Sequence, residues 1–178
     1  IAYLVLAMLQ DVRCWVAWII SSLMYLFVMY SAGLYMEALL QIFYIFIGFY
    51  GLYQWRFQSD LNETLKISTW NVKNHLIVIG ILIFLTSVSG YILTIYTSAA
   101  SPFVDAFTTW GAIAASYLVA KKILENWFYW FVIDSVSVFL FISRELYPTA
   151  FLFVVYLVLV VFGYSAWRKS WQHADEQN

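Results

Sequence analysis

The apolar residues of this chain lie in long, nearly unbroken runs rather than on one face of a helix or in strict alternation. Runs of about 20 apolar residues are long enough to cross the ~30 Å hydrocarbon core of a bilayer. Two prolines fall where such runs begin, and proline is tolerated in the first turn of a helix. The pattern predicts seven helical segments: Ile1–Leu9, Trp15–Tyr30, Tyr35–Trp55, His75–Tyr96, Phe103–Ala120, Trp127–Ser143 and Pro148–Trp167.

The first segment, Ile1–Leu9, is too short to span a bilayer. It has no basic flank before it and no small-residue cleavage site after it, so it does not resemble a signal peptide. We interpret it as the remainder of a helix whose first part precedes residue 1. The one long polar interruption is Arg56–Asn74, for which we expect an exposed loop.

Composition supports a membrane protein and excludes several other classes. Hydrophobic residues make up 64% of the chain and charged residues 11%, whereas soluble domains are about half apolar and a quarter charged. A single cysteine, Cys14, excludes an internal disulfide and a multi-cysteine metal site. The net charge of −1 argues against nucleic acid as a partner. The chain is therefore expected to be an all-α protein of the lipid bilayer.

Basic residues are distributed unequally between the two predicted faces of the membrane. With seven helices, the connections after the first, third and fifth segments share a side with the C-terminus. That side would hold Arg13, Arg56, Lys66, Lys73, Lys121, Lys122, Arg168 and Lys169, and the other side only Arg144. Loops rich in Lys and Arg stay in the cytoplasm, so the pattern predicts a cytoplasmic C-terminus and an outward N-terminus.

The sequence partly repeats itself after 112 positions, without a gap. Trp15 then falls on Trp127, Trp18 on Trp130, Gly51 on Gly163 and Trp55–Arg56 on Trp167–Arg168. Matched leucine or alanine would mean little in apolar sequence, but matched tryptophans in one register favour a true repeat. Shared membrane composition is the alternative explanation.

The register of the repeat predicts its geometry. The second segment matches the sixth and the third matches the seventh, so the two copies have the same orientation. We therefore predict a 3+1+3 parallel repeat: a three-helix bundle (1–56), a loop and linking helix (57–97), a second bundle (98–171) and a cytoplasmic tail (172–178). Transporters built from parallel repeats bind substrate between the halves, near the midplane.

Candidate chemistry lies on two of the segments. Trp127, Trp130 and Asp134 are three and four residues apart, which places them on one helical face. A carboxylate this deep in a bilayer costs ~3 kcal/mol or more and should face the protein interior or a wet cavity. A structural hydrogen bond to a neighbouring helix is the alternative role for Asp134.

A second stripe runs along the third segment and comprises Gln41, Tyr44, Gly48, Gly51 and Trp55. The glycines allow helices to approach closely or leave room for a ligand. A buried amide such as that of Gln41 needs a partner, which could be a ligand hydroxyl, Tyr156 or Asn126. Signatures of a metal site, a nucleophilic enzyme or a nucleotide-binding loop do not occur, so no cofactor and no catalytic residue is expected.

The string Lys121–Asp134, KKILENWFYWFVID, resembles the ENWxxW segment of the PnuC family of vitamin transporters. The likeness continues in Ser101–Pro102, Asp105–Ala106 and Leu146–Tyr147, and Gly51–Trp55 resembles the GWYQW motif with Leu52 where tryptophan is usual. The resemblance implies a fold like that of the SWEET sugar transporters and a homotrimer in the bacterial inner membrane. It also implies facilitated diffusion of nicotinamide riboside, trapped by cytosolic phosphorylation.

The substrate stays open between two vitamins. Cys14–Trp15 and Thr69–Trp70 resemble relatives devoted to thiamine, and both vitamins carry a cationic aromatic ring that suits tryptophan faces. A heptahelical receptor or sorting protein is the alternative of another class, which the short tail disfavours; a membrane enzyme ranks third. We expect substrate contacts from Trp127, Trp130, Asn126, Asp134, Gln41, Tyr44, Tyr156 and Trp55.

Overall fold

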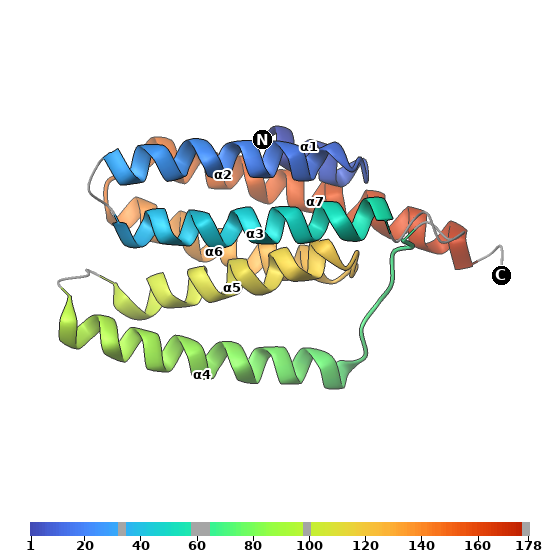
Figure 1. Ribbon diagram of the computed structural model, residues 1–178. Coiled ribbons are helices and arrows are strands. Elements are labelled where there is room, and N and C mark those ends of the chain that lie inside the picture. Colours follow the sequence, from blue (N-terminus) through green and yellow to red (C-terminus); the bar gives the residue numbers. More distant parts are fainter. Residues whose placement is uncertain (32–34, 58–64, 98–100, 176–178) are drawn as a thin grey trace.

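Seven α-helices account for most of the computed structural model, which describes residues 1–31, 35–57, 65–97 and 101–175 of the chain. They are α1 (Ala2–Met8), α2 (Arg13–Ser31), α3 (Tyr35–Phe57), α4 (Val72–Tyr96), α5 (Pro102–Ala120), α6 (Asn126–Ser143) and α7 (Tyr147–Asp175) (Figure 1). Each predicted hydrophobic segment is one of these helices, which confirms the all-α prediction. Helix α7 continues past Trp167 through much of the predicted tail.

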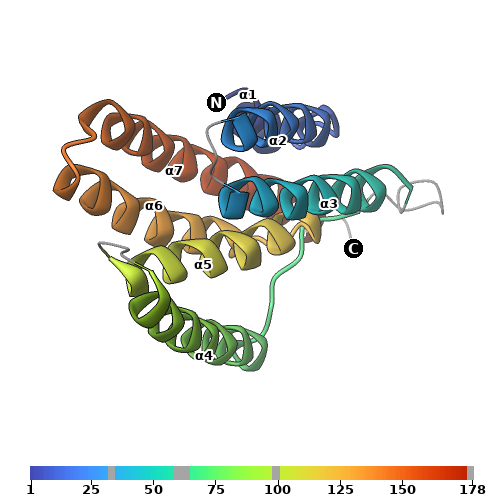
Figure 2. The same ribbon diagram turned by 60° about the vertical axis from the view of Figure 1, so that its left-hand side comes forward.

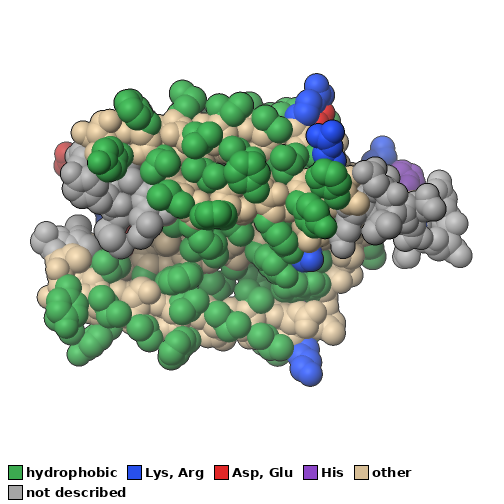
Figure 3. Space-filling view, in the orientation of Figure 1, with side chains coloured by type: hydrophobic (Ala, Val, Ile, Leu, Met, Phe, Trp, Pro, Cys, Tyr) green, Lys and Arg blue, Asp and Glu red, His purple; other side chains and the backbone are tan. Residues whose placement is uncertain are grey.

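Among the residues that the structure describes, four helices are long and apolar enough to cross a membrane, namely α4, α5, α6 and residues Tyr147–His173 of α7. Apolar side chains cover the outside of the body, and the visible Lys and Arg side chains gather mainly at the end that carries the C-terminus (Figure 3). An apolar belt with charges at its ends matches a bilayer as the surrounding solvent.

The helix ends follow local chemistry. Pro102 begins α5, where its missing N–H costs nothing. The Asn71 side chain caps α4 by accepting a hydrogen bond from the backbone N–H of Asn74 at 3.0 Å. The turns that end α1 and α5 contain Gln10 and Lys122 with φ of 55° and 51°, a conformation that is strained for residues with a side chain.

The helices pack as two pairs with α5 between them. Helix α2 lies along α3, α6 lies along α7, and α5 contacts α3, α4 and α6. Helix α1 joins the two pairs because it contacts both α2 and α7. Figures 1 and 2 show α4 at the outer edge, next to α5, and only 6% of its most apolar window is buried.

The same contacts occur twice, 112 positions apart. A Cβ added to Gly51 would lie 2.4 Å from the Trp15 ring, and one added to Gly163 would lie 2.3 Å from the Trp127 ring. In both places the absence of a side chain lets an indole lie on the helix backbone. The rings of Trp15 and Trp55 meet edge to face at 5.6 Å, and those of Trp127 and Trp167 at 5.4 Å.

The connection between α3 and α4 is not simply the exposed loop that its polarity predicts. Ile67 is buried in the core. Ser68 pairs with the turn between α5 and α6: its N–H donates to the Lys122 carbonyl at 3.1 Å and its carbonyl accepts from Leu124 at 2.8 Å. The Glu125 carboxylate accepts from the Trp70 backbone N–H at 3.3 Å rather than capping α6. These hydrogen bonds attach the connection to the helix bundle at the end of the molecule that carries the C-terminus.

Candidate functional site

A cavity of about 1310 Å³ lies between the helices, with lining residues from all seven of them. Ala7, Val119 and Trp127 line it at the end of the molecule that carries the C-terminus. Asp105 and Arg144 line it near the opposite end. Because Asp105 and Val119 both belong to α5, the cavity extends about 21 Å at 1.5 Å per residue. This length covers most of a bilayer core.

Six of the eight side chains predicted to bind substrate line this one cavity. They are Gln41 and Tyr44 from α3, Trp127, Trp130 and Asp134 from α6, and Tyr156 from α7. The helical spacing of three and four in α3 and α6 brings each set to the inward side of its helix. Gln41 makes no hydrogen bond to any described residue, neither to Tyr156 nor to Asn126.

Asp134 is the most unusual of these residues. Its side chain is only 3% exposed, and it forms no hydrogen bond or ion pair with a described residue. Burying a carboxylate without a partner is costly. The alternative role, a structural hydrogen bond to a neighbouring helix, is not seen among the described residues. Tyr156 lies close enough to Asp134 and Tyr25 for electrostatic interaction.

Of the four tryptophans among the described lining residues, Trp18, Trp127 and Trp130 are held in different ways. Trp18 is fixed, because its indole N–H donates to the Tyr44 carbonyl at 2.8 Å and its ring lies 4.6 Å from that of Tyr3. Trp127 packs on Gly163 and against Trp167. Trp130 is partly buried and has no ring partner and no hydrogen bond among the described residues. It packs against the buried core cluster and also lines the cavity.

Two predicted residues lie outside the cavity lining. Trp55 is buried between Trp15 and Trp167, and its indole N–H donates to the Val119 carbonyl at 3.2 Å. Asn126 begins α6, is fully buried, and donates from its side chain to the Ile123 carbonyl at 2.7 Å. Both belong to the packed end of the bundle rather than to its middle.

An ion pair marks the opposite end of the cavity. The Arg144 guanidinium, just after α6, donates to both carboxylate oxygens of Asp105 in the first turn of α5, at 3.0 and 3.1 Å. Each partner is about one-third exposed. Because Arg144 and Asp105 neutralise each other, Asp134 is the ionisable group without a counter-charge among the described lining residues.

Sequence reasoning missed several lining residues. Trp18 corresponds to Trp130 by the shift of 112 positions, and Ser137 lies one helical turn after Asp134. The shift of 112 positions could have predicted Trp18, and the i, i+3 spacing from Asp134 could have predicted Ser137. Asp105 and Arg144 carry no such signal, because only the packing of α5 against α6 brings them together.

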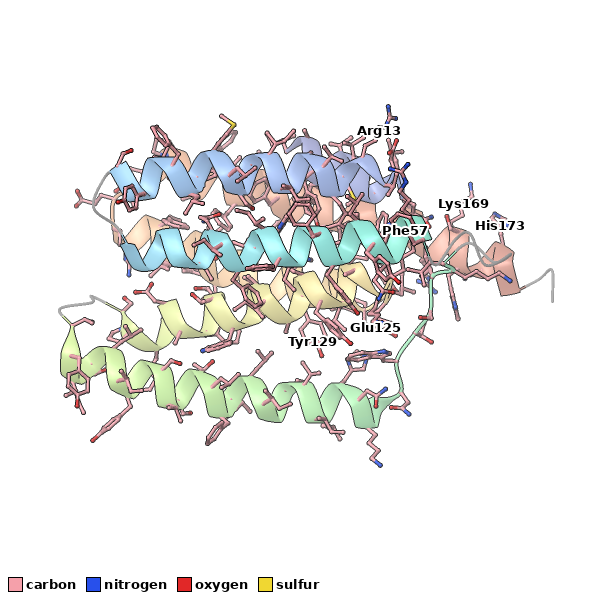
Figure 4. The ribbon with its side chains drawn as sticks, in the orientation of Figure 1. Arg13, Phe57, Glu125, Tyr129, Lys169 and His173 are labelled. Carbon is pink, nitrogen blue, oxygen red and sulfur yellow. The ribbon has the colours of Figure 1, made fainter. Side chains whose placement is uncertain are left out.

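The polar contacts at the C-terminal end surround the connection to α4. Glu125 and Tyr129 point toward that connection and toward α4, whereas Arg13 and Lys169 point away from the body (Figure 4). His75 of α4 and the Tyr129 hydroxyl pair at 2.9 Å. These contacts hold α4 beside the bundle and lie outside the cavity.

A bundle of apolar helices around a long, partly polar cavity has the architecture of a membrane transporter. The comparison with known families agrees: the family described as "Nicotinamide mononucleotide transporter" matches residues 1–169. The chain belongs to this family, which consists of transporters rather than enzymes.

Individual members with known names are only distantly similar to this chain in sequence. The chain is 29% identical over 164 residues to the nicotinamide riboside transporter PnuC of Neisseria mucosa, covering 85% of this chain but 62% of that protein. It is 29% identical over 126 residues to the riboflavin/roseoflavin transporter RibM of Streptomyces davaonensis, covering 68% of this chain and 58% of that protein. The chain thus spans about three-fifths of each of these two relatives.

A solved structure has a similar fold. The crystal structure of the vitamin B3 transporter PnuC superposes with a TM-score of 0.74 at 24% identity, covering 96% of this chain and 77% of that one. The similarity extends over nearly the whole chain, so the arrangement of the helices is that of a known transporter.

Proposed function

We propose that this protein carries nicotinamide riboside across the bacterial inner membrane by facilitated diffusion, and that cytosolic phosphorylation then traps the vitamin. The proposal is carried by one observation: the buried Asp134 carboxyl, which has no hydrogen-bond or ion-pair partner among the described residues, lies in a cavity that Trp130 also lines. A cationic aromatic ring satisfies both groups, since it supplies the counter-charge and stacks on the indole. The named relative from Neisseria mucosa supports this substrate.

Thiamine is the second candidate. It also joins a cationic aromatic ring to a hydroxyl-bearing part, and the Cys14–Trp15 and Thr69–Trp70 pairs resemble thiamine-transporting relatives. A third vitamin, riboflavin, is carried by the relative from Streptomyces, but its ring is neutral and would leave Asp134 without a counter-charge.

The proposed binding site lies near mid-membrane between α3, α6 and α7. Trp130 stacks on the ring, Asp134 balances its charge, and Gln41, Tyr44 and Tyr156 bond the hydroxyl groups. Trp127 closes the cavity below the site. Trp55 and Asn126 are not part of this proposal because neither lines the cavity.

The proposed architecture is a 3+1+3 parallel repeat of SWEET type, with α4 as the linking helix. The paired contacts of Trp15 with Gly51 and Trp127 with Gly163 support it. The C-terminus is proposed to be cytoplasmic because, of the nine Lys and Arg residues in the sequence, all but Arg144 are assigned to the same side of the membrane as the C-terminus. A homotrimer is proposed from the family resemblance, and light scattering of the detergent complex would test it.

Binding to the purified protein tests the substrate. We expect radiolabelled nicotinamide riboside to bind and to be displaced by its unlabelled form, with thiamine competing more weakly and riboflavin hardly at all. Stronger competition by thiamine would reassign the substrate within the same site. Saturable binding of riboflavin but of neither cation would contradict the proposal.

A further inference from the structure

The cavity ends at a layer of contacts between the first three helices and the last three. The indole N–H of Trp55 on α3 donates to the carbonyl of Val119 on α5 at 3.2 Å. The indole N–H of Trp167 on α7 donates to the carbonyl of Ala7 on α1 at 3.0 Å. The two bonds are equivalent under the shift of 112 positions, since Trp55 and Ala7 correspond to Trp167 and Val119.

The residues that accept these bonds also form the floor of the cavity. Ala7 and Val119 line the cavity on one side, and their carbonyls are held by buried indoles on the other. Trp55, Trp167, Ala7 and Val119 are all at most 6% exposed. A solute in the cavity therefore cannot leave at the C-terminal end while both bonds are intact.

A third contact lies at the same level. The Lys122 ammonium, in the turn after α5, donates to the Gln10 side-chain oxygen in the turn after α1 at 3.2 Å. It also lies 4.7 Å from the centre of the Trp55 ring. Burial lowers the pKa of Lys122, and both turns are in the strained left-handed conformation. Such strain persists only where surrounding contacts hold it.

We propose that Trp55, Trp167, Gln10 and Lys122 form the inner gate of the transporter, which must separate for solute to pass to the side that carries the C-terminus. The gate gives Trp55 a role other than substrate contact. The inference rests on the proposed function only in taking the cavity as the route of the solute, and it does not depend on which vitamin is carried.

Cys14, the one cysteine of the sequence, supplies a reporter for gate opening. It is 0% exposed and belongs to the same buried cluster as Trp55, Trp127 and Trp167, and it does not line the cavity. A charged maleimide can therefore reach its thiol only when the gate opens.

The test compares the rate of Cys14 labelling in wild type and in Trp55→Phe/Trp167→Phe, which keeps a smaller aromatic ring at each position but removes both N–H donors. Each lost hydrogen bond should raise the open population about fivefold, or ~1 kcal/mol, so the double variant should label about 25-fold faster. Trp18→Phe is the matched control, because it removes an indole–carbonyl bond within one half; its labelling rate should stay within about twofold of wild type.

Equal rates in the wild type and in a folded double variant would overturn the gate, and so would faster labelling in the Trp18→Phe control. If the double variant does not fold, the two single variants replace it, each with an expected increase of about fivefold.

A second measurement locks the gate instead of weakening it. In a Cys14→Ser background, Gln10→Cys and Lys122→Cys are joined with a reductant-cleavable bifunctional thiosulfonate. Uptake of nicotinamide riboside and thiamine should stop on cross-linking and return on reduction, and uptake that continues in the cross-linked protein would overturn the gate. If the unlinked protein carries neither vitamin, the proposed function fails, and Cys14 labelling alone decides the gate.

Discussion

At the scale of single residues, Asp134 governs which solutes the cavity can hold. Its carboxyl group is buried and has no counter-charge among the described residues, whereas Arg144 and Asp105 at the end of the cavity neutralise each other. A cation entering the cavity therefore gains an electrostatic interaction that a neutral molecule of the same shape does not. Selectivity for charge should follow from this one group.

Changing Asp134 to Asn keeps the shape of the side chain and removes its charge. Affinity for a cationic vitamin should fall by ~1–3 kcal/mol, or about five- to a hundredfold, while binding of an uncharged analogue should change by less than about twofold. Calorimetry with both ligands measures the difference. An Asp134→Asn protein that binds the cation with wild-type affinity would remove this residue from the site.

Trp130 is the residue proposed to stack on the aromatic ring of the ligand. Trp130→Ala should lose stacking and cation–π contact, a loss of ~1–3 kcal/mol or about five- to a hundredfold in affinity. Trp130→Phe retains an aromatic face and should lose less. Trp130 also packs against the buried core cluster, so Trp130→Ala should lower the melting temperature, whereas Trp130→Phe should stay within a few degrees of wild type. Unchanged affinity in Trp130→Ala would place the stacking surface elsewhere.

Sequence alone predicted the residues in mid-helix better than those near helix ends. Trp130, Asp134, Gln41 and Tyr44 were found because helical spacing fixes the face on which they lie. Trp55 and Asn126 were also predicted to contact substrate, and the structure places both outside the cavity lining. Their roles depend on partners that are distant in sequence, such as the Val119 carbonyl for Trp55, which no local pattern reveals.

At the scale of helices, two glycines set the distance between paired elements. A Cβ on Gly51 or Gly163 would lie within 2.4 Å of a large, enclosed indole ring, whereas one on Gly80 of α4 meets nothing within 4 Å. Gly51→Ala and Gly163→Ala should each destabilise the fold by about 1–3 kcal/mol. Gly80→Ala, the matched control, should be neutral or slightly stabilising.

Thermal unfolding in detergent, followed by size-exclusion chromatography, measures these three variants. Gly51→Ala and Gly163→Ala should lower the melting temperature by similar amounts, since the two glycine–tryptophan contacts are equivalent under the shift of 112 positions. A large loss for one and none for the other would contradict the equivalence of the two halves. A loss as large in Gly80→Ala would show that α4 packs against more than α5.

The number and order of the helices were predictable because each is a separate apolar run. The connection after α3 was not, because its polarity predicts an exposed loop while one residue, Ile67, anchors it in the core. The pairing of Ser68 with the α5–α6 turn involves a single bridge, which is too short to leave a period in the sequence.

At the scale of the whole molecule, we propose that the protein is a passive carrier with a gate at its basic end. Membrane carboxylates that could relay protons are scarce: Asp134 lies in mid-helix, while Asp105 and Glu125 lie at helix ends. The cavity reaches from the gate residues to the Asp105–Arg144 ion pair, so one movement of the two halves could expose it to alternate sides. Such movement requires no ion gradient.

Uptake of radiolabelled nicotinamide riboside into vesicles that contain the purified protein tests this account most directly. We expect the inside concentration to rise to the outside concentration without overshoot, with a protonophore leaving the time course unchanged and protein-free vesicles remaining empty. Accumulation above the outside concentration that a protonophore abolishes would contradict passive carriage. Vesicles that equilibrate no faster than protein-free ones, with thiamine as with nicotinamide riboside, would contradict the transport of a cationic vitamin altogether.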